Sequence, residues 1–213
     1  MSMGIARLAD GQPPEPKRRD GRERLLDGAG RLLAERGYAA MELRDVAERG
    51  NAPRGSIYHH FPGGKAQLAA EATEVDGLRV RKSIERSLAE RGLKETLAMF
   101  GEIFRRRADS HPERIGCPVA AAAMARPEDP ALAAAATDAF QSWEGAIADA
   151  LVKEGVKPKQ AATFAAVVVS TIEGALLRTR AAGSHAPLDD AVDGLGQALD
   201  GLLRVATSKR APA

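Results

Sequence analysis

Apolar residues recur at helical spacing along most of the chain. In the first such segment they occupy positions 25, 26, 29, 32 and 33, one face of a helix that Gly37 can end. Breaks rich in Gly and Pro separate the segments, and no strand-like alternation is present in the sequence. An all-α protein is therefore predicted. After the first helix, the expected helical segments are 41–50, 54–61, 65–90, 93–109, 117–126, 130–154, 158–182 and 188–206.

The two short segments, 41–50 and 54–61, predict a helix-turn-helix unit. Gly50 suits a left-handed residue that closes the first helix, and Pro53 suits the first turn of the second. Pro62 and the glycines after it end the second helix. A helix, a turn of a few residues and a short second helix form the unit that presents its second helix to the major groove of DNA.

The composition agrees with close-packed helices, and the positively charged residues are concentrated near the N-terminus. Apolar residues make up 44% of the 213 positions and aromatic residues only 4%, so the interior is built mainly from Ala, Leu and Val. Up to Lys65 the chain holds 12 Lys and Arg against 9 Asp and Glu, and the remainder holds 19 against 20. The run KRRDGRER at 17–24 predicts a basic arm for nucleic acid, or else the solvated start of a helix.

The cysteine count and the lengths of the apolar runs indicate the cellular compartment of the protein. The single cysteine, Cys117, excludes an internal disulfide and fits a reducing environment. Neither a leader sequence nor an apolar run of membrane-spanning length is recognised. We therefore expect a cytoplasmic protein with no membrane partner.

The stretch 43–68, LRDVAERGNAPRGSIYHHFPGGKAQL, resembles the tetracycline-repressor (TetR) family of transcriptional regulators. The run GSIYHHF followed by Lys65 and Leu68 is a specific match, and a helix ending in ERGY precedes it. Together with the later GCPVAA, the stretch is similar to the branch that includes lincomycin-resistance and flavonoid-responsive repressors.

The resemblance implies a three-helix helix-turn-helix DNA-binding domain at the N-terminus, followed by a C-terminal helical domain for ligand binding and dimerisation. We expect the first at 17–64 and the second at 65–208, between flexible tails at 1–16 and 209–213. Pro53 departs from the family, many members of which have Ser or Thr there. The side-chain oxygen that would cap the helix and approach a phosphate is missing, and Arg54 is the candidate to replace that contact.

The residues expected to contact DNA lie in and around the second short helix. Arg54, at its start, can donate two hydrogen bonds to one guanine, and Lys65 suits a phosphate together with the first N–H groups of the next helix. Ile57 and Phe61 face inward. The full expected set is Arg44, Arg54, Gly55, Ser56, Tyr58, His59, His60 and Lys65.

Histidine and cysteine also raise the question of a metal or catalytic site. Adjacent His59 and His60 point about 100° apart on a helix, so they do not converge on one ion, and a half-buried His60 is the alternative to a DNA contact. An enzyme would need Cys117 or His111, but no motif pairs the thiol with a base, and a lone cysteine is more often a small buried hydrophobe. We expect no catalysis, metal or cofactor.

Aromatic residues share faces in the C-terminal half. Phe100 and Phe104 are spaced i, i+4, and Phe140 and Trp143 are spaced i, i+3, so two helices can each project a pair into one interior. By analogy with the family we expect a mostly apolar effector cavity that takes a flat hydrophobic molecule, with ordinary core packing as the alternative. The expected lining is Phe100, Phe104, Cys117, Met124, Phe140, Trp143 and Phe164.

The last helix carries two parallel stripes. Large apolar residues step by 4, 3, 4 and 3 from Leu188, and small ones form a second stripe, Ala191, Gly194, Ala198 and Gly201. This pattern predicts a four-helix bundle with a second copy, or burial against the same chain. The expected dimer residues are Val168, Ile172, Leu176, Leu188, Val192, Leu195, Leu199 and Leu202.

Taken together, these patterns and the resemblance predict a homodimeric repressor. It would bind a palindromic operator in double-stranded DNA and release it when a small, largely apolar molecule binds. The alternatives are an enzyme that uses Cys117 or His111, and a constitutive DNA-binding protein with a filled core.

Overall fold

The computed structural model describes residues 20–53, 55–110 and 115–208. Within these ranges it contains α-helices and no strands, which confirms the predicted all-α fold. The helices are α1 (Gly21–Arg36), α2 (Leu43–Arg49), α3 (Gly55–His60), α4 (Gly64–Arg91), α5 (Leu93–Ser110), α6 (Pro118–Met124), α7 (Pro130–Lys153), α8 (Pro158–Ala182) and α9 (Ala186–Ser208).

Short polar and cyclic residues set the helix boundaries. Asp20 and Asp129 cap α1 and α7, because each side chain accepts a hydrogen bond from a backbone N–H of the first turn. Proline occupies the first turn of α6, α7 and α8, where no backbone donor is needed. Gly37, with φ of 76°, ends α1 as predicted.

The turn between α2 and α3 differs from the prediction at one residue. Gly50 has an ordinary right-handed conformation with φ of −78°, whereas Asn51 takes the left-handed one with φ of 46°. Asn tolerates this region because its short polar side chain hydrogen-bonds locally. Gly50 is needed for another reason: a Cβ there would lie 3.0 Å from the Arg24 carbonyl oxygen, so the glycine lets α2 approach α1.

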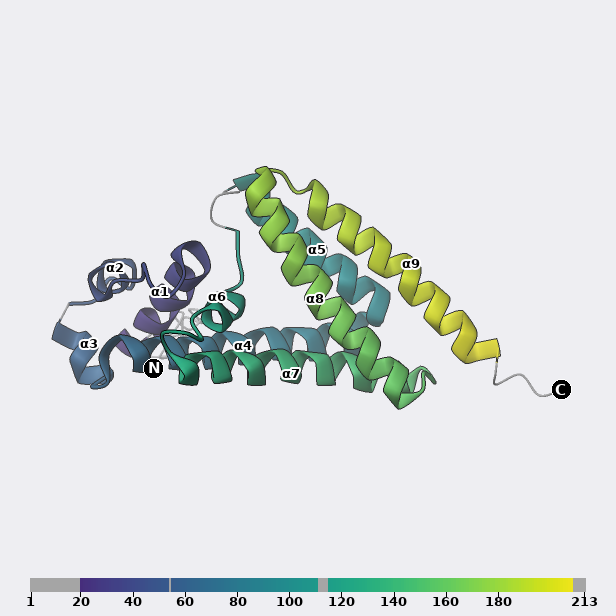
Figure 1. The fold of residues 1–213 in the computed structure, drawn as a ribbon, viewed down its shortest axis with the longest axis horizontal. Coiled ribbons are helices and arrows are strands. Elements are labelled where there is room, and N and C mark those ends of the chain that lie inside the picture. Colours follow the sequence, from purple (N-terminus) through teal and green to yellow (C-terminus); the bar gives the residue numbers. More distant parts are fainter. Residues whose placement is uncertain (1–19, 54, 111–114, 209–213) are drawn as a thin grey trace, which may run out of the picture.

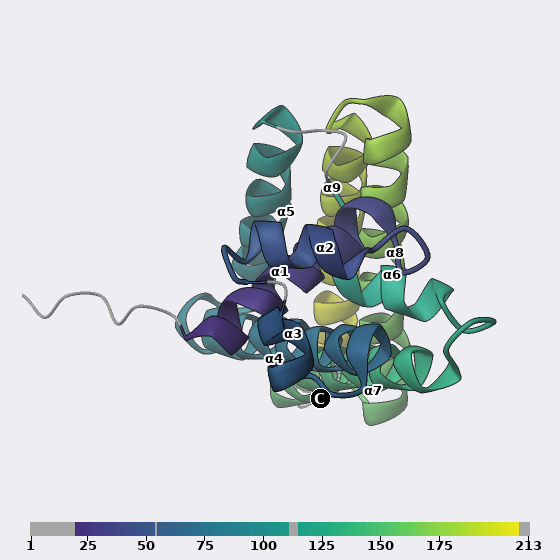
Figure 2. The same cartoon turned by 90° about the vertical axis from the view of Figure 1, so that its left-hand side faces the viewer.

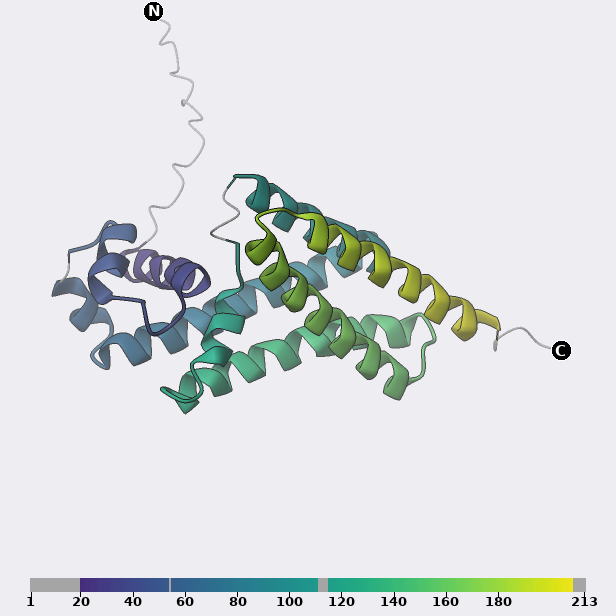
Figure 3. The same ribbon diagram turned by 45° about the horizontal axis from the view of Figure 1, so that its top comes forward.

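The helices form two parts that share α4 (Figure 1). α1, α2 and α3 lie together at one end of α4, and seen from that end they stand in front of the other helices (Figure 2). α7 runs beside α4, while α5, α8 and α9 cross above this pair at a slant (Figure 3). A continuous apolar core extends from the leucines of α1 to Trp143 of α7.

α4 and α7 approach closely at a glycine. A Cβ on Gly77 would lie 2.7 Å from the Cβ of Ala139, and the Trp143 indole N–H donates to the Gly77 carbonyl oxygen at 2.8 Å. Small residues at a helix crossing allow the backbones to come together, and the hydrogen bond satisfies the only polar atom of a buried indole. This contact fixes the middle of α4 on α7.

α8 corrects the expectation that no segment is long and apolar enough to span a membrane. An 18-residue window of this helix has a mean hydropathy of 1.5, and only 22% of the window is buried. The same length and composition occur in core helices of globular proteins, and α8 packs here against α7 and α9. Its low burial shows that a large part of an apolar helix has no partner within the described chain.

Candidate DNA-binding surface and effector cavity

α3 has one buried and one exposed side. Ile57 is 2% exposed and Phe61, directly after the helix, is fully buried, so these side chains anchor α3 against the core as predicted. Tyr58 is 62% exposed and His59 is exposed as well. α3 therefore presents a polar and aromatic surface outward from a rigid base.

The other predicted DNA-contacting residues of this region differ in exposure and in hydrogen bonding. Ser56 donates its hydroxyl to the Pro53 carbonyl oxygen at 2.6 Å, which closes the first turn of α3. His60 is half-buried beside Phe61, which agrees with the alternative to a DNA contact given for this residue. Gly55 is exposed with open space where a Cβ would stand. Arg54, the expected base-reading residue, lies outside the described residues.

Two cations border α3 from neighbouring helices. Arg44 of α2 has a side chain that is 54% exposed and lies 3.3 Å from carboxylate oxygens of Glu42 and Asp45. Lys65, in the first turn of α4, donates to the Ala39 carbonyl oxygen at 3.1 Å and lies 4.6 Å from the centre of the Tyr38 ring. The ion pairs of Arg44 are exposed and therefore weak, so its guanidinium can exchange them for phosphate.

Only part of the predicted basic arm lies within the described residues, and that part contacts other helices. Residues 17–19 lie outside the described ranges. Arg22 instead pairs with Glu71 and stacks over the Phe61 ring, and the Arg24 guanidinium donates to the Gly50 carbonyl oxygen at 2.9 Å. These two arginines hold α1 against α4 and α2, so they are structural ties and not part of a free arm.

A partly open cavity of about 160 Å³ lies in the C-terminal part, bordered by α4, α5, α7, α8, α9 and the segment before α6. Aliphatic side chains such as Ile84 and Val168 form much of its wall. Five of the seven predicted residues line it: Phe100, Phe104, Cys117, Trp143 and Phe164.

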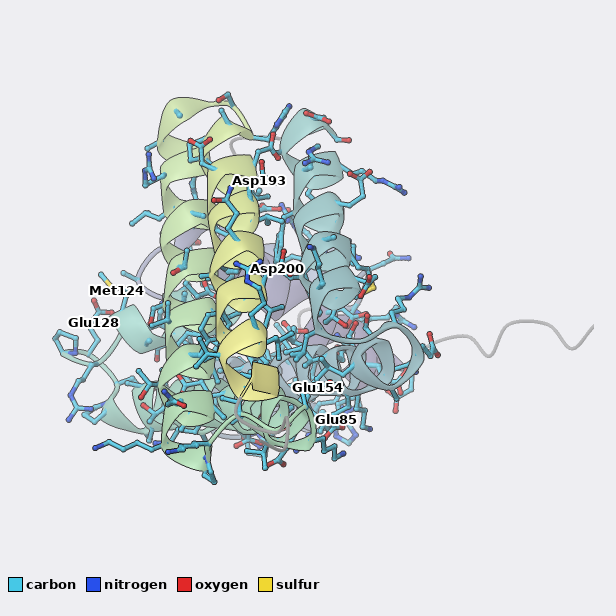
Figure 4. All side chains as sticks on the ribbon, turned by 90° about the vertical axis from the view of Figure 1, so that its right-hand side faces the viewer. Glu85, Met124, Glu128, Glu154, Asp193 and Asp200 are labelled. Atoms are coloured by element: carbon cyan, nitrogen blue, oxygen red, sulfur yellow. The ribbon has the colours of Figure 1, made fainter. Side chains whose placement is uncertain are left out.

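The other two predicted lining residues lie elsewhere. Met124 is 82% exposed at the end of α6, where it projects beside Glu128 away from α5, α8 and α9 (Figure 4). Phe140 packs edge-on against Trp143, with ring centres 5.3 Å apart, and supports the wall from behind. Helical spacing identified the correct side of α7 but not which ring reaches the cavity.

Two charged groups of the cavity wall were missed by the sequence analysis, Glu173 of α8 and Arg107 of α5. Burial raises the pKa of the Glu173 carboxyl to about 7. A signal was available, because Glu173 is a lone acid within the apolar run VVVSTIEGALL. Arg107 stacks over the Phe104 ring at 5.7 Å, and its charge favours the ionised form of Asp76.

The Cys117 thiol is hydrogen-bonded to Glu173. Burial, and then the charge of Glu173, raise the pKa of this thiol well above its ordinary value. A thiol is nucleophilic only as the thiolate, so this environment suppresses the chemistry that an enzyme would need. Cys117 behaves as a buried wall residue of the cavity.

Comparison with known proteins agrees with this geometry. Residues 25–72 match the profile of bacterial regulatory proteins of the tetR family, and residues 94–193 match that of the LmrA/YxaF-like transcriptional regulator C-terminal domain. An uncharacterized HTH-type transcriptional regulator of Mycobacterium tuberculosis is 37% identical over 175 residues, which cover 79% of this chain and 88% of the relative. The chain belongs to the TetR family.

Relatives and solved structures extend this result. The HTH-type transcriptional regulator LmrA of Bacillus subtilis is 31% identical over 174 residues, 79% of this chain and 91% of LmrA. YxaF from the same organism is 32% identical over 80% of this chain and 91% of its own length. A TetR regulator from Legionella pneumophila has the same fold, with a TM-score of 0.76 over 86% of this chain and 99% of that chain at 20% identity.

The two parts of this TetR-family chain touch beside the cavity. Gly116 lies so close to α1 that a Cβ would stand 2.5 Å from the Ala34 carbonyl oxygen. Arg180, near the end of α8, donates to the Ala34 carbonyl oxygen at 3.0 Å and to that of Glu35. The cavity wall and the last turn of α1 are therefore in direct contact.

The predicted dimer residues lie mainly inside the chain, which corrects the predicted interface. Leu176, Leu188, Leu195 and Leu199 are at most 4% exposed, and a Cβ on Gly101 of α5 would stand 2.8 Å from Val192. Val168 and Ile172 line the cavity, and Leu202 packs against the core. On this side of α8 and α9, the large apolar residues pack against their own chain, which was the alternative to a dimer contact.

A different stripe is exposed on both helices. On α8 its members step by 4, 3, 4, 3 and 4 residues and none is charged: Thr163, Val167, Ser170, Gly174, Leu177 and Ala181. On α9 the stripe consists of exposed Gly194 and Ala198, half-buried Gly201 and exposed Val205, so it follows most of the predicted small-residue stripe and ends at a valine. Asp200 points to another side of α9, where it pairs with Lys94 of α5 at 2.8 Å (Figure 4).

Proposed function

We propose that this TetR-family regulator is a repressor that binds a palindromic operator as a homodimer and releases it when a small, largely apolar molecule enters the cavity. The observation that carries the proposal is the cavity itself, because α4 forms part of its wall and continues beneath the DNA-binding helices. A ligand that changes the position of this wall can change the position of α3. A cytoplasmic location is part of the same proposal.

The exposed side of α3 supports the DNA-binding step. Tyr58 and His59 project from a helix whose other side is buried, and Arg44 and Lys65 flank it. Side chains at the centre of such a surface reach base edges, and flanking cations neutralise phosphates and fix the register. We propose the same eight residues as the DNA-contacting set, with Arg54 retained on the sequence alone.

The exposed stripe on α8 and α9 supports the dimer. Small residues let helices of two copies approach closely, and Val167, Leu177 and Val205 supply apolar area at 47%, 72% and 49% exposure. Two helices from each copy would form a four-helix bundle around a twofold axis. We propose this stripe as the interface in place of the buried leucines.

The cavity supports the ligand-release step over the two alternatives. A constitutive DNA-binding protein with a filled core has no use for an apolar space of about 160 Å³. An enzyme that used Cys117 would need a thiolate, which burial disfavours. We propose residues 17–64 as the DNA-binding domain and 65–208 as the effector and dimerisation domain, although α4 packs extensively against α1 across this boundary.

The test is binding to duplex DNA selected from a random pool. The full chain should enrich a palindromic sequence whose half-sites are about one helical turn apart. Arg44→Ala should weaken binding to all sequences alike and lower the salt slope by about one unit, because one phosphate contact is lost.

Arg86→Ala provides the matched control, because Arg86 is an exposed arginine of α4 that lies away from α3. It should leave both the affinity and the salt slope unchanged. A protein that enriches no sequence and ignores duplex DNA at low ionic strength would contradict the proposed function.

A further inference from the structure

The effector cavity has one acidic group in an otherwise apolar wall. Glu173 projects from the middle of α8, and among the described lining residues only Arg107 also carries a charge. Thr96, a polar lining residue, already donates its hydroxyl to the Gly92 carbonyl oxygen at 2.6 Å. Glu173 is therefore the main polar group that the wall offers to a ligand.

The carboxyl of Glu173 has unused hydrogen-bonding capacity. Among the described residues, the weak S–H donor of Cys117 is its hydrogen-bond partner. An ionised carboxylate accepts up to about four hydrogen bonds, so most of its acceptor positions stay open. Arg107 does not supply the missing charge, because its guanidinium lies over the Phe104 ring and interacts with Asp76.

We propose that the effector carries a protonated amine next to a single-ring apolar group, and that the ammonium pairs with Glu173. This inference rests on the proposed function of the cavity. An ammonium brings up to three donors and the opposite charge to a site where an unpaired carboxylate is poorly solvated. A neutral ligand brings at most a hydrogen bond and no compensating charge, and an anionic ligand is repelled by the carboxylate.

The size of the cavity limits the apolar part of the ligand. Its volume of about 160 Å³ is close to that of an apolar cavity of roughly 150 Å³ known to hold benzene. Phe100, Phe104, Trp143 and Phe164 surround this space with aromatic surfaces that suit a planar ring. A ring with a short aminoalkyl chain matches both the volume and the single acid.

The test compares three molecules with the same ring and different end groups: 2-phenylethylamine, 2-phenylethanol and phenylacetate. Binding is followed by the emission of Trp143, the only tryptophan of the chain, which lines the cavity. The amine should bind at least about tenfold more tightly than the alcohol, and phenylacetate should bind most weakly.

Glu173→Gln separates charge from shape. It should weaken binding of the amine by about tenfold and change that of the alcohol by less than about threefold, because the amide keeps the volume but loses the charge. Glu90→Gln, at an exposed position of α4 away from the cavity, should bind all three as the unaltered protein does.

Three results would overturn the ligand class: equal or tighter binding of the alcohol, an amine preference that survives Glu173→Gln, or no change in Trp143 emission with any of the three. Operator binding by the ligand-free protein is measured in parallel. Intact operator affinity without amine preference rejects the ligand class alone. Failure to bind duplex DNA rejects the proposed function, and the fluorescence result still decides the ligand class.

Discussion

Glu173 links the pH of the solution to the stability of the fold. Its pKa rises from an ordinary 4.5 to about 7 in the folded chain, so between these values the folded state holds a proton that the unfolded state has released. The stability that this carboxyl contributes is fully present below about pH 4.5 and is lost as the pH rises through about 7. The neighbouring Cys117 thiol stays neutral over this range, because burial raises its pKa well above the ordinary value.

Glu173→Gln should therefore stabilise the protein more at high pH than at low pH. The gain in the free energy of unfolding should be larger at pH 8 than at pH 5 by about 2 to 3 kcal/mol. Urea denaturation followed by Trp143 emission measures it, with Glu90→Gln as the exposed control. The same gain at both pH values would contradict the titration of a buried carboxyl.

The Cys117 thiol should be protected from alkylation. Cys117 is only partly exposed and burial raises the pKa of its thiol well above the ordinary value, so iodoacetamide should modify the native protein at least about tenfold more slowly than the urea-unfolded chain. Mass spectrometry of timed samples gives both rates. Cys117→Ser should still bind the operator, and a loss of DNA binding that tracks alkylation would instead favour a functional thiol.

At the level of elements, the exposed stripe of α8 predicts the oligomeric state. Leu177→Glu places a charge on the proposed interface and should convert the proposed dimer to a monomer at micromolar concentration, because a buried unpaired carboxylate is strongly unfavourable. The helix content should not change, since Leu177 is 72% exposed in the single chain. Light scattering after size exclusion gives the mass.

Ala162→Glu is the control for that change. It adds the same charge to an exposed position of α8 outside the stripe and should leave the mass unchanged. If Leu177→Glu also keeps the mass of the unaltered protein, the stripe is not the interface.

The helix pattern was predictable because local chemistry sets it. Gly37 and the prolines that begin α6, α7 and α8 set boundaries that depend only on backbone sterics. The left-handed residue before α3 was misplaced by one position, since Asn51 and Gly50 both tolerate that conformation and packing against α1 decided between them.

Local chemistry does not determine which other helix each side of a helix packs against, so these contacts could not be predicted from the sequence. α9 has two sides with helical spacing, and the sequence alone does not say which one meets its own chain. The larger side chains, such as Leu195 and Leu199, fill the core, and the small residues stay outside. The prediction of the cavity lining was limited for the same reason. Helical spacing places Phe140 and Trp143 on one side of α7, but it does not show which ring reaches the cavity.

At the scale of the whole molecule, Arg180 ties the C-terminal helices to the DNA-binding helices. Its guanidinium donates to the Ala34 and Glu35 carbonyl oxygens in the last turn of α1. Arg180→Ala should free this end of α1 and lower operator affinity by about threefold, as expected for the loss of exposed hydrogen bonds to a charged group.

Fluorescence anisotropy with labelled operator measures that change. Arg178→Ala, at an exposed position on the same helix, is the charge-matched control and should have no effect. Binding of cavity ligands, read from Trp143, should be unaltered by both substitutions. Equal operator affinity for Arg180→Ala and the unaltered protein would show that this tie does not position α1.

The contact at Gly77 has a mechanical consequence for the whole chain. It divides the 28 residues of α4 into two halves, each about 20 Å long at 1.5 Å per residue. Val80, Ile84 and Leu88 border the ligand space on one half, and α4 also packs against α1 of the DNA-binding part. If α4 tilted as a rigid rod about Gly77, its two ends would move by about the same distance in opposite directions, because the two halves are equally long. Under the proposed function, we therefore expect that a molecule that only fills the space leaves the operator bound, and that release requires the wall of α4 to move by about as much as the DNA contacts must shift.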